Sequence, residues 1–170
     1  NVKMEFKQIT ITNFLSYFGE NTVDFSEMTT VILGQNTSGK SKFFDAINWV
    51  LFERVYNTDI YSWVTDKKEI INLVPNKKCI KESILDKKDE METSVRIIIT
   101  DGINDIVIVR SYYYTFDDNK PILSSKGLSW RELNEVGEVE VEDYDDKAEL
   151  RIQEKFPIEI RDFFLFQREA

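Results

Sequence analysis

The residues best suited to chemistry lie close together in the segment Gly34-Gln35-Asn36-Thr37-Ser38-Gly39-Lys40-Ser41. Gly34 and Gly39 permit backbone turns that a Cβ would obstruct, so successive N–H groups point into one concavity and hold phosphate oxygens. Lys40 would then reach the β- and γ-phosphates of a nucleotide, and the Ser41 hydroxyl would enter the shell of a Mg²⁺ ion. The spacing of these residues therefore predicts a P-loop.

A P-loop needs a buried strand before it and a helix after it, because the helix N-terminus presents free N–H groups and a positive dipole end to the phosphates. Thr29–Leu33 is β-branched and apolar, which is typical of such a strand. After Lys40 the chain has no Gly or Pro for about four turns, and apolar residues occupy almost every side of the expected helix. We expect this helix to be buried on most sides.

Composition excludes several other classes of protein. The 170 residues contain 22 Lys and Arg, 31 Asp and Glu and no His, which gives a net charge of −9. This excludes chemistry based on His and argues against a globally basic nucleic-acid binder. The single cysteine, Cys79, allows no internal disulfide, which favours a reducing cytoplasm. No apolar run approaches membrane-spanning length, and the chain length fits one domain.

Strand patterns lie on both sides of the P-loop. Glu5–Phe14 predicts a strand, Gly19–Asn21 a turn and Thr22–Phe25 a second strand. Thr93–Thr100 and Ile106–Phe116 predict a hairpin with a loop of about four residues. We expect an antiparallel sheet from these strands to flank the central strand and the P-loop helix.

The other segments carry weaker signals. Asn57–Lys68 has no clear period, and its aromatic residues Tyr61 and Trp63 are either loop anchors or, less plausibly, stacking surfaces for a base or ribose. Leu128–Arg131 predicts a short edge strand, and Val139 and Val141 alternate with glutamates as in a solvent-facing strand. We expect the basic run Lys77–Lys88 to form a solvated face rather than a phosphate contact. We also expect a helix over Tyr144–Phe156, which Pro157 ends.

The order of these motifs resembles the N-terminal lobe of the SMC-type ABC ATPases, and especially the Rad-fifty repair ATPase and the bacterial DndD proteins of DNA phosphorothioate systems. The resemblance is carried by Asn13–Tyr17, Val23–Phe25, Val31–Ser41 and Phe44–Ile47. The segments Trp49–Phe52 and Ile70–Lys78 are similar to the DndD pattern in particular. Three residues depart from the family: Thr37 stands where Gly is usual, Lys42 where Ser or Thr is usual, and Leu15 where Rad-fifty-type proteins often have a basic residue.

Near the end of the chain, Ile160–Glu169 resembles the Q-loop region of the same ATPases. There a strand delivers a Gln to the Mg²⁺ and to the attacking water, and Gln167 stands at that place, about 130 residues after the P-loop. The resemblance thus implies catalytic roles for Lys40 and Gln167, and metal ligation by Ser41 and Gln167. The residues we expect to bind the nucleotide are Gly34, Asn36, Thr37, Ser38, Gly39, Lys40, Ser41 and Lys42.

Asp101 follows the apolar run Ile97–Ile99 and so imitates a Walker B carboxylate. In SMC-like proteins a Glu follows that Asp, whereas Gly102 follows here. We therefore favour a hairpin turn at this position over a metal ligand.

The resemblance implies an α/β P-loop NTPase fold in which residues 1–170 form one domain, the N-terminal half of an ABC-type head that ends at the Q-loop. We expect either a fragment or one chain of a split protein, whose partners are its own C-terminal lobe and a second head. The implied function is hydrolysis of ATP with Mg²⁺ on head dimerisation, together with DNA and DNA-processing proteins, in repair or anti-phage defence. Two alternatives are a small self-contained P-loop kinase or NTPase and a non-hydrolysing interaction module.

Overall fold

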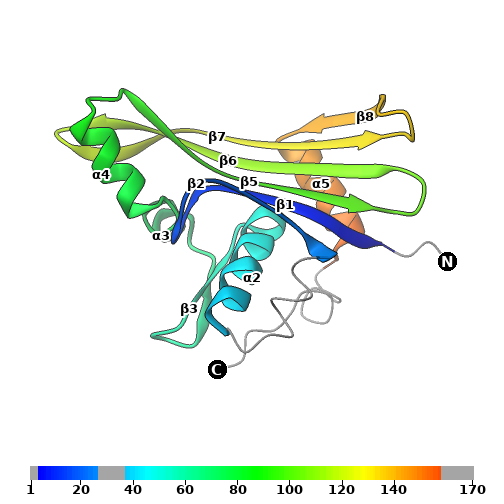
Figure 1. Cartoon of the computed structure of the whole chain (residues 1–170), viewed down its shortest axis with the longest axis horizontal. Helices are drawn as coiled ribbons and strands as arrows, with labels where there is room; N and C mark the ends of the chain where they lie inside the picture. The colour runs from blue at the N-terminus through cyan, green and yellow to red at the C-terminus, as the bar shows by residue number, and fades with distance from the viewer. Residues whose placement is uncertain (1–3, 27–36, 158–170) are drawn as a thin grey trace.

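A six-stranded antiparallel sheet forms one layer of the molecule (Figure 1). The computed structural model describes residues 4–26 and 37–157, with the side chains of residues 37–42 left out. The strands follow the order β2-β1-β5-β6-β7-β8 across the sheet. Their bounds are β1 (Glu5–Phe14), β2 (Tyr17–Asp24), β5 (Glu90–Thr100), β6 (Asp105–Asp117), β7 (Lys120–Leu133) and β8 (Val139–Tyr144).

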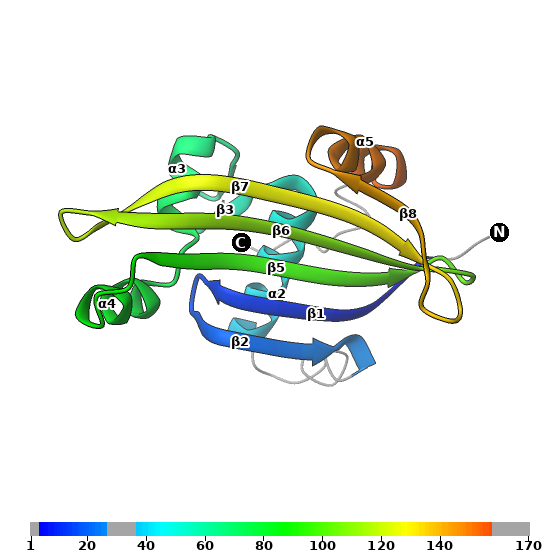
Figure 2. The same cartoon turned by 90° about the horizontal axis from the view of Figure 1, so that it is seen from above.

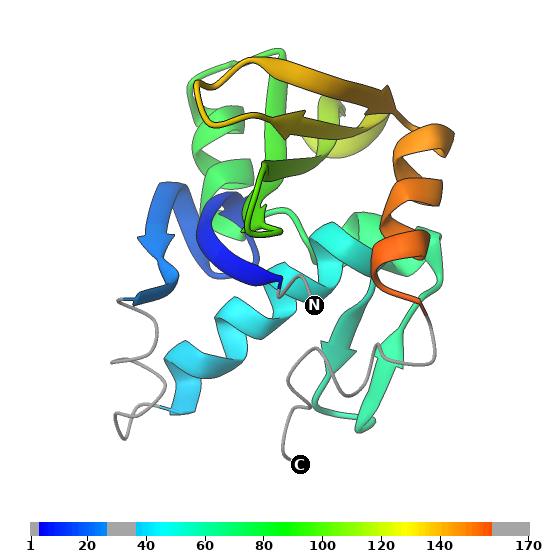
Figure 3. The same ribbon diagram turned by 90° about the vertical axis from the view of Figure 1, so that its right-hand side faces the viewer.

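The helices lie on one side of this sheet. The long helix α2 (Thr37–Phe52) passes beneath the strands, as the end-on view in Figure 3 shows. Figure 2 looks down on the other face, which no described helix covers. The remaining elements are β3 (Val55–Asn57) and β4 (Ser62–Val64), which pair as a hairpin, and the helices α3 (Lys67–Leu73), α4 (Lys77–Leu85) and α5 (Asp146–Lys155).

The core lies between the sheet and α2. Along β5 and β6, buried residues such as Ile97 and Ile108 alternate with less buried ones, as the two-residue period of a half-covered sheet requires. Helix α2 contributes buried side chains from almost every side, which confirms the prediction: Phe43, Phe44, Ala46, Ile47, Trp49, Val50 and Leu51. The predicted central strand Thr29–Leu33 lies outside the described residues.

The predicted turn at Gly19–Asn21 is wrong, because those residues lie within β2. The chain reverses instead at Leu15 and Ser16, directly after β1. Leu15 has a φ of 50°, in the left-handed region that turns require and that few non-glycine residues adopt. Gly19 also has a positive φ, 71°, but it lies within β2 and its backbone N–H donates to Asn13 Oδ1 at 2.8 Å. Its backbone conformation therefore produces an irregularity in the strand and does not form a turn.

The short edge strand predicted at Leu128–Arg131 is also wrong. These residues lie in the middle of the 14-residue strand β7, which pairs with β6 on one side and β8 on the other. The length of this strand is hard to predict from the sequence because much of β7 is polar and its residues have no strong strand propensity. The strand forms because its backbone hydrogen-bonds to β6. The edge is β8, whose predicted solvent-facing character is confirmed.

Other local predictions have mixed outcomes. The hairpin of β5 and β6 and the helix α5 are confirmed, whereas Asn57–Lys68, which showed no period, contains most of the β3–β4 hairpin. Two short helices, α3 and α4, were not predicted. Each begins with a side-chain cap, in which Asp66 accepts from Lys68 N and Asn76 accepts from Cys79 N.

Candidate nucleotide-binding site

The predicted phosphate-binding residues run directly into α2. Residues 37–42 form the first turns of this helix. The backbone of Lys40 and Ser41 therefore lies near the N-terminal end of α2. The first turn contains no acidic residue, which leaves the positive end of the helix dipole without a competing carboxylate. Gly34, Asn36 and Gln167 lie outside the described residues, as do the side chains of residues 37–42. The structure therefore confirms the helix after the predicted P-loop, whereas the contacts of the P-loop side chains and of Gln167 remain predictions.

Aromatic contacts fix α2 against the first strand and the sheet. The Trp49 ring lies between Phe14, with ring centroids 5.1 Å apart, and Tyr112, which it meets edge-on at 5.0 Å. Nearer the start of the helix, Phe43 packs against Tyr17 at 6.0 Å. Burial and the nearby Asp45 carboxylate raise the pKa of Tyr17 to about 12, so its hydroxyl stays protonated at neutral pH.

Two segments that carried the family resemblance meet in space. The Leu15 N–H donates to Val74 O at 2.7 Å, and the Asn76 N–H donates to Asn13 O at 2.9 Å, around an isolated bridge between Phe14 and Pro75. The buried Asn76 side chain adds a bond from Nδ2 to Leu15 O at 2.8 Å. This clasp holds the turn after β1 against the start of α4, next to the side chains that support α2.

A cluster of charged side chains lies at the other end of α2, and the sequence analysis did not find it. Glu53 follows the helix directly and accepts from Lys126 Nζ at 2.9 Å and from the Tyr112 hydroxyl. Its carboxylate also pairs with Lys67 at 3.2 Å and Arg110 at 3.5 Å. The signal that was overlooked is a pair of charges inside apolar runs: Glu53 after Trp49–Phe52, and Arg110 after Ile106–Val109.

Arg110 joins this cluster to two helices. Its side chain is 6% exposed, and its Nε donates to Val50 O, one of the carbonyls left free at the end of α2, at 3.1 Å. Its Nη2 lies 3.3 Å from Glu149 on α5. The guanidinium fork thus contacts the end of α2, the carboxylate that follows it and a neighbouring helix at once.

The cluster holds Glu53 in its charged form. Burial alone would raise the pKa of this carboxyl, but Arg110 and the bonds from Tyr112 and Lys126 outweigh burial and lower the pKa to about 2. The pKa of Tyr112 is raised by its own burial and by the Glu53 carboxylate, so the phenol remains the hydrogen-bond donor. Glu53 therefore stays charged over the whole physiological pH range.

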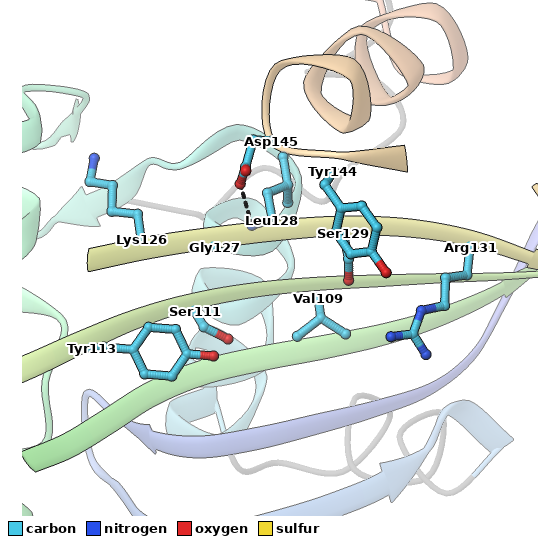
Figure 4. A pocket seen from close by; sticks show the side chains of 10 residues that line it. All are labelled: Val109, Ser111, Tyr113, Lys126, Gly127, Leu128, Ser129, Arg131, Tyr144 and Asp145. Carbon is cyan, nitrogen blue, oxygen red and sulfur yellow. Dashed lines mark hydrogen bonds between the residues drawn. The ribbon is translucent and has the colours of Figure 1, made fainter. Parts of the chain in front are cut away.

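Two hollows lie near this cluster. One, of about 230 Å³, is lined by Glu53, Arg110 and Glu149 among others. The second, of about 400 Å³, lies on the uncovered face of the sheet, where Tyr113 and Tyr144 border small residues such as Ser111 (Figure 4). Asp145 anchors its rim by accepting from Leu128 N at 3.3 Å.

Asp101 is a turn residue, as the favoured interpretation predicted. Its Oδ1 accepts from the backbone N–H groups of Ile103 at 2.9 Å and Asn104 at 2.7 Å. The bond from Asn104 is the main reason why the pKa of Asp101 is lowered. Within residues 4–26 and 37–157, no group of three or more His, Cys, Asp or Glu side chains is arranged to hold a metal ion.

The aromatic residues of the β3–β4 hairpin divide into an anchor and an exposed tip. Trp63 packs against Tyr56 with ring centroids 5.3 Å apart, and the Arg54 guanidinium lies 3.9 Å from the centre of its indole. This confirms the anchor role for Trp63. Tyr61, at the tip between the two strands, is 68% exposed.

Comparison with known proteins agrees with the P-loop prediction. The family model described as "AAA domain" matches residues 8–170. The chain belongs to this AAA domain family. Family membership supports a nucleotide-binding protein of ATPase type, and the α/β structure with its antiparallel sheet fits a P-loop NTPase-like fold.

Relatives of this AAA domain include SMC proteins. It is 48% identical over 48 residues to the chromosome partition protein Smc of Mycoplasma genitalium, and 41% identical over 51 residues to that of Lactiplantibacillus plantarum. It is 47% identical over 49 residues to structural maintenance of chromosomes protein 3 of Caenorhabditis elegans. These alignments cover 28–30% of this chain and 4–5% of the relatives. The similarity is therefore local, and it supports an SMC-like ATPase.

None of the helices in the described ranges is both long and apolar enough to span a membrane.

Proposed function

We propose that residues 1–170 form the ATP-binding N-terminal lobe of an SMC-like ABC ATPase head. The observation that carries this proposal is that Thr37–Ser41 of the predicted P-loop form the start of α2, a 16-residue helix that is buried over Phe43–Leu51 and has no acidic residue in its first turn. A helix N-terminus after a glycine-bounded loop suits phosphate groups. The AAA domain match and the local similarity to SMC proteins support the same function.

Each site residue has a role in this proposal. The backbone of residues 34–39 and the side chain of Lys40 hold the phosphates of ATP, while Asn36, Thr37, Ser38 and Lys42 complete the pocket. Ser41 and Gln167 bind the Mg²⁺ ion, which supplies charge stabilisation at the γ-phosphate. Gln167 also positions the attacking water. Its assignment depends on its place in the sequence, about 130 residues after the P-loop.

The partners follow from the same family. We propose that a C-terminal lobe of the parent protein completes the site and that two heads enclose ATP between them. Hydrolysis on head dimerisation would then act on DNA, with DNA-processing partner proteins. The segments Trp49–Phe52 and Ile70–Lys78 favour the DndD branch, and so a role in anti-phage defence or DNA repair.

The two alternatives are weaker. A self-contained kinase needs Asp101 as a metal ligand, and the contacts of Asp101 with Ile103 and Asn104 account for this side chain as part of a turn. A non-hydrolysing module would lose a partner interaction on Lys40→Ala without any measurable nucleotide binding.

The deciding experiment measures Mg²⁺-ATP binding and turnover by this polypeptide, first alone and then with the C-terminal segment of its parent protein. Lys40→Ala is the control. We expect turnover only in the mixture, rising steeply with protein concentration and stimulated by duplex DNA. Turnover by the polypeptide alone that depends on Asp101 would support the kinase. Binding that is unaffected by Lys40→Ala would contradict both.

A further inference from the structure

We infer that Glu53 and Arg110 are positioning residues for nucleotide binding, because they hold the far end of the P-loop helix and so determine where its phosphate-binding end lies. The inference rests on the proposed function for its ligand, Mg²⁺-ATP. The two residues would act through α2, which separates them from Lys40 by most of its length.

The first observation is that Glu53 violates two local preferences. Its φ of 50° places it in the left-handed region, where a non-glycine residue costs about 1 kcal/mol relative to glycine. A carboxylate at a helix C-terminus is also unfavourable, because the dipole is negative there. Residues that break local rules in this way are expected at sites where function requires them.

The second observation is how completely the surroundings compensate for this. The Glu53 carboxylate, 12% exposed, is held by Arg110 and Tyr112 on β6, Lys126 on β7 and Lys67 at the start of α3. A buried charge cluster is generally no more stabilising than apolar residues of the same volume. Since apolar packing is non-directional, the charges add a defined position and orientation that packing alone does not give.

The third observation is that Arg110 holds the helix backbone itself. It donates to Val50 O at 3.1 Å and pairs with Glu149 on α5, so α2 is fixed relative to β6 and α5 together. The aromatic contacts of Phe43 and Trp49 hold the helix against Tyr17 and Tyr112. The polar bonds of Arg110 add a directional restraint at the C-terminal end of the helix.

The length of α2 converts a small tilt into a large displacement. Sixteen helical residues extend about 24 Å, so a tilt of about 2–3° about the anchored end moves the first turn by about 1 Å. A displacement of that size is enough to weaken a pre-organised site by one to two orders of magnitude. We therefore expect loss of the cluster to weaken Mg²⁺-ATP binding about tenfold while the fold is retained.

The test uses variants that are expected to fold. Glu53→Gly removes the carboxylate and suits the left-handed backbone, and Arg110→Lys keeps the charge but loses the guanidinium fork. Glu154→Gln is the matched control, because it removes an exposed carboxylate from the same helix as Glu149. Dissociation constants for Mg²⁺-ATP are measured in the mixture with the C-terminal segment, and folding is checked by circular dichroism.

Hydrogen exchange of the nucleotide-free polypeptide provides a second measurement. If the cluster positions the whole helix, Glu53→Gly speeds exchange in the second turn of α2, where the backbone amides are hydrogen-bonded within the helix, as well as in its last turn. A purely local role would change the last turn alone, and that result would overturn the inference.

The two proposals fail in different ways. If the wild type binds Mg²⁺-ATP and Lys40→Ala does not, but Glu53→Gly and Arg110→Lys bind within twofold of wild type, the positioning role is wrong and the proposed function stands. If the wild type binds no better than Lys40→Ala, the proposed function is wrong and the positioning of a nucleotide site is wrong with it.

Discussion

At the scale of single residues, Glu53 shows how a side chain in an unfavourable position can still be stable. Its backbone conformation and its place at a helix C-terminus both oppose a glutamate, yet Lys126, Lys67 and Arg110 surround its carboxylate. The Glu53 pKa is lowered to about 2 because the surrounding positive charges and hydrogen bonds favour the charged carboxylate despite its burial. The stability of the chain should therefore depend on this group in a way that pH reveals.

Glu53→Gln is expected to destabilise the protein at neutral pH and much less in acid. Because the pKa of the folded carboxyl is below the usual 4.5, its stabilising contribution is present above about pH 5 and is lost as the pH falls towards 2. Allowing for partial solvent screening, we expect a loss of about 2 kcal/mol at pH 7 that falls below about 1 kcal/mol at pH 3. Urea denaturation at the two pH values measures it.

Glu154→Gln provides the comparison, since this exposed carboxylate should change the free energy of unfolding by less than about 0.5 kcal/mol at either pH. An equal loss at pH 7 and pH 3 for Glu53→Gln would mean that the charge of Glu53 is unimportant and that the loss comes from replacing an acceptor oxygen by an NH₂ group, which cannot accept from Tyr112 or Lys126.

At the scale of elements, the clasp between the turn after β1 and the start of α4 joins two segments that lie far apart in the sequence. Asn76 caps α4 through its Oδ1, which accepts from Cys79 N at 2.8 Å, and binds Leu15 O through its Nδ2. The same side chain thus begins a helix and closes a turn about sixty residues earlier in the sequence. An amide is needed because one group must accept while the other donates.

Asn76→Ala should cost about 2 kcal/mol, of which about half is the lost helix cap and half the unsatisfied carbonyl of Leu15. Asn76→Ser retains a cap acceptor but is too short to reach Leu15, so we expect about 1 kcal/mol. Thermal or urea unfolding of the two variants measures both contributions. Asn72→Ala, on the exposed side of α3, is the control, and a loss as large as that of Asn76→Ala would show that the assay does not isolate the clasp.

At the scale of the whole molecule, the architecture is a sheet with helices on one face and a second face that no described helix covers (Figure 2). Neighbouring residues on one strand therefore contribute unequally to the stability of the fold. Ile97 is fully buried towards α2, whereas Ile98 points to the other face and is partly exposed. The sequence alone presents them as equivalent members of one apolar run.

Ile97→Ala should destabilise the chain by about 3–4 kcal/mol through loss of burial and a residual cavity, and Ile98→Ala by about 1 kcal/mol. Urea denaturation of the isolated polypeptide measures the two. Equal losses would show that the second face is also covered in solution, for example by another copy of the chain, and sedimentation of the wild type would then test that directly.

The sequence by itself determined those features that depend on local chemistry. Spacing from Gly34 to Ser41 predicts phosphate binding, the apolar run after Lys40 predicts a buried helix, and Asp101-Gly102 predicts a turn, because each signal lies within a few adjacent residues. The structure confirms α2 and the hairpin at Asp101. The roles of Lys40, Ser41 and Gln167 remain predictions.

Tertiary structure decided what depends on residues far apart in the chain. The long strand β7 forms because β6 and β8 pair with it, although its own residues are largely polar. The turn at Leu15 needs partners from Val74 and Asn76, and the charge of Glu53 needs Arg110, which lies 57 residues away. Sequence patterns report local preference, whereas hydrogen bonds and ion pairs between distant segments exist only once the fold has brought them together.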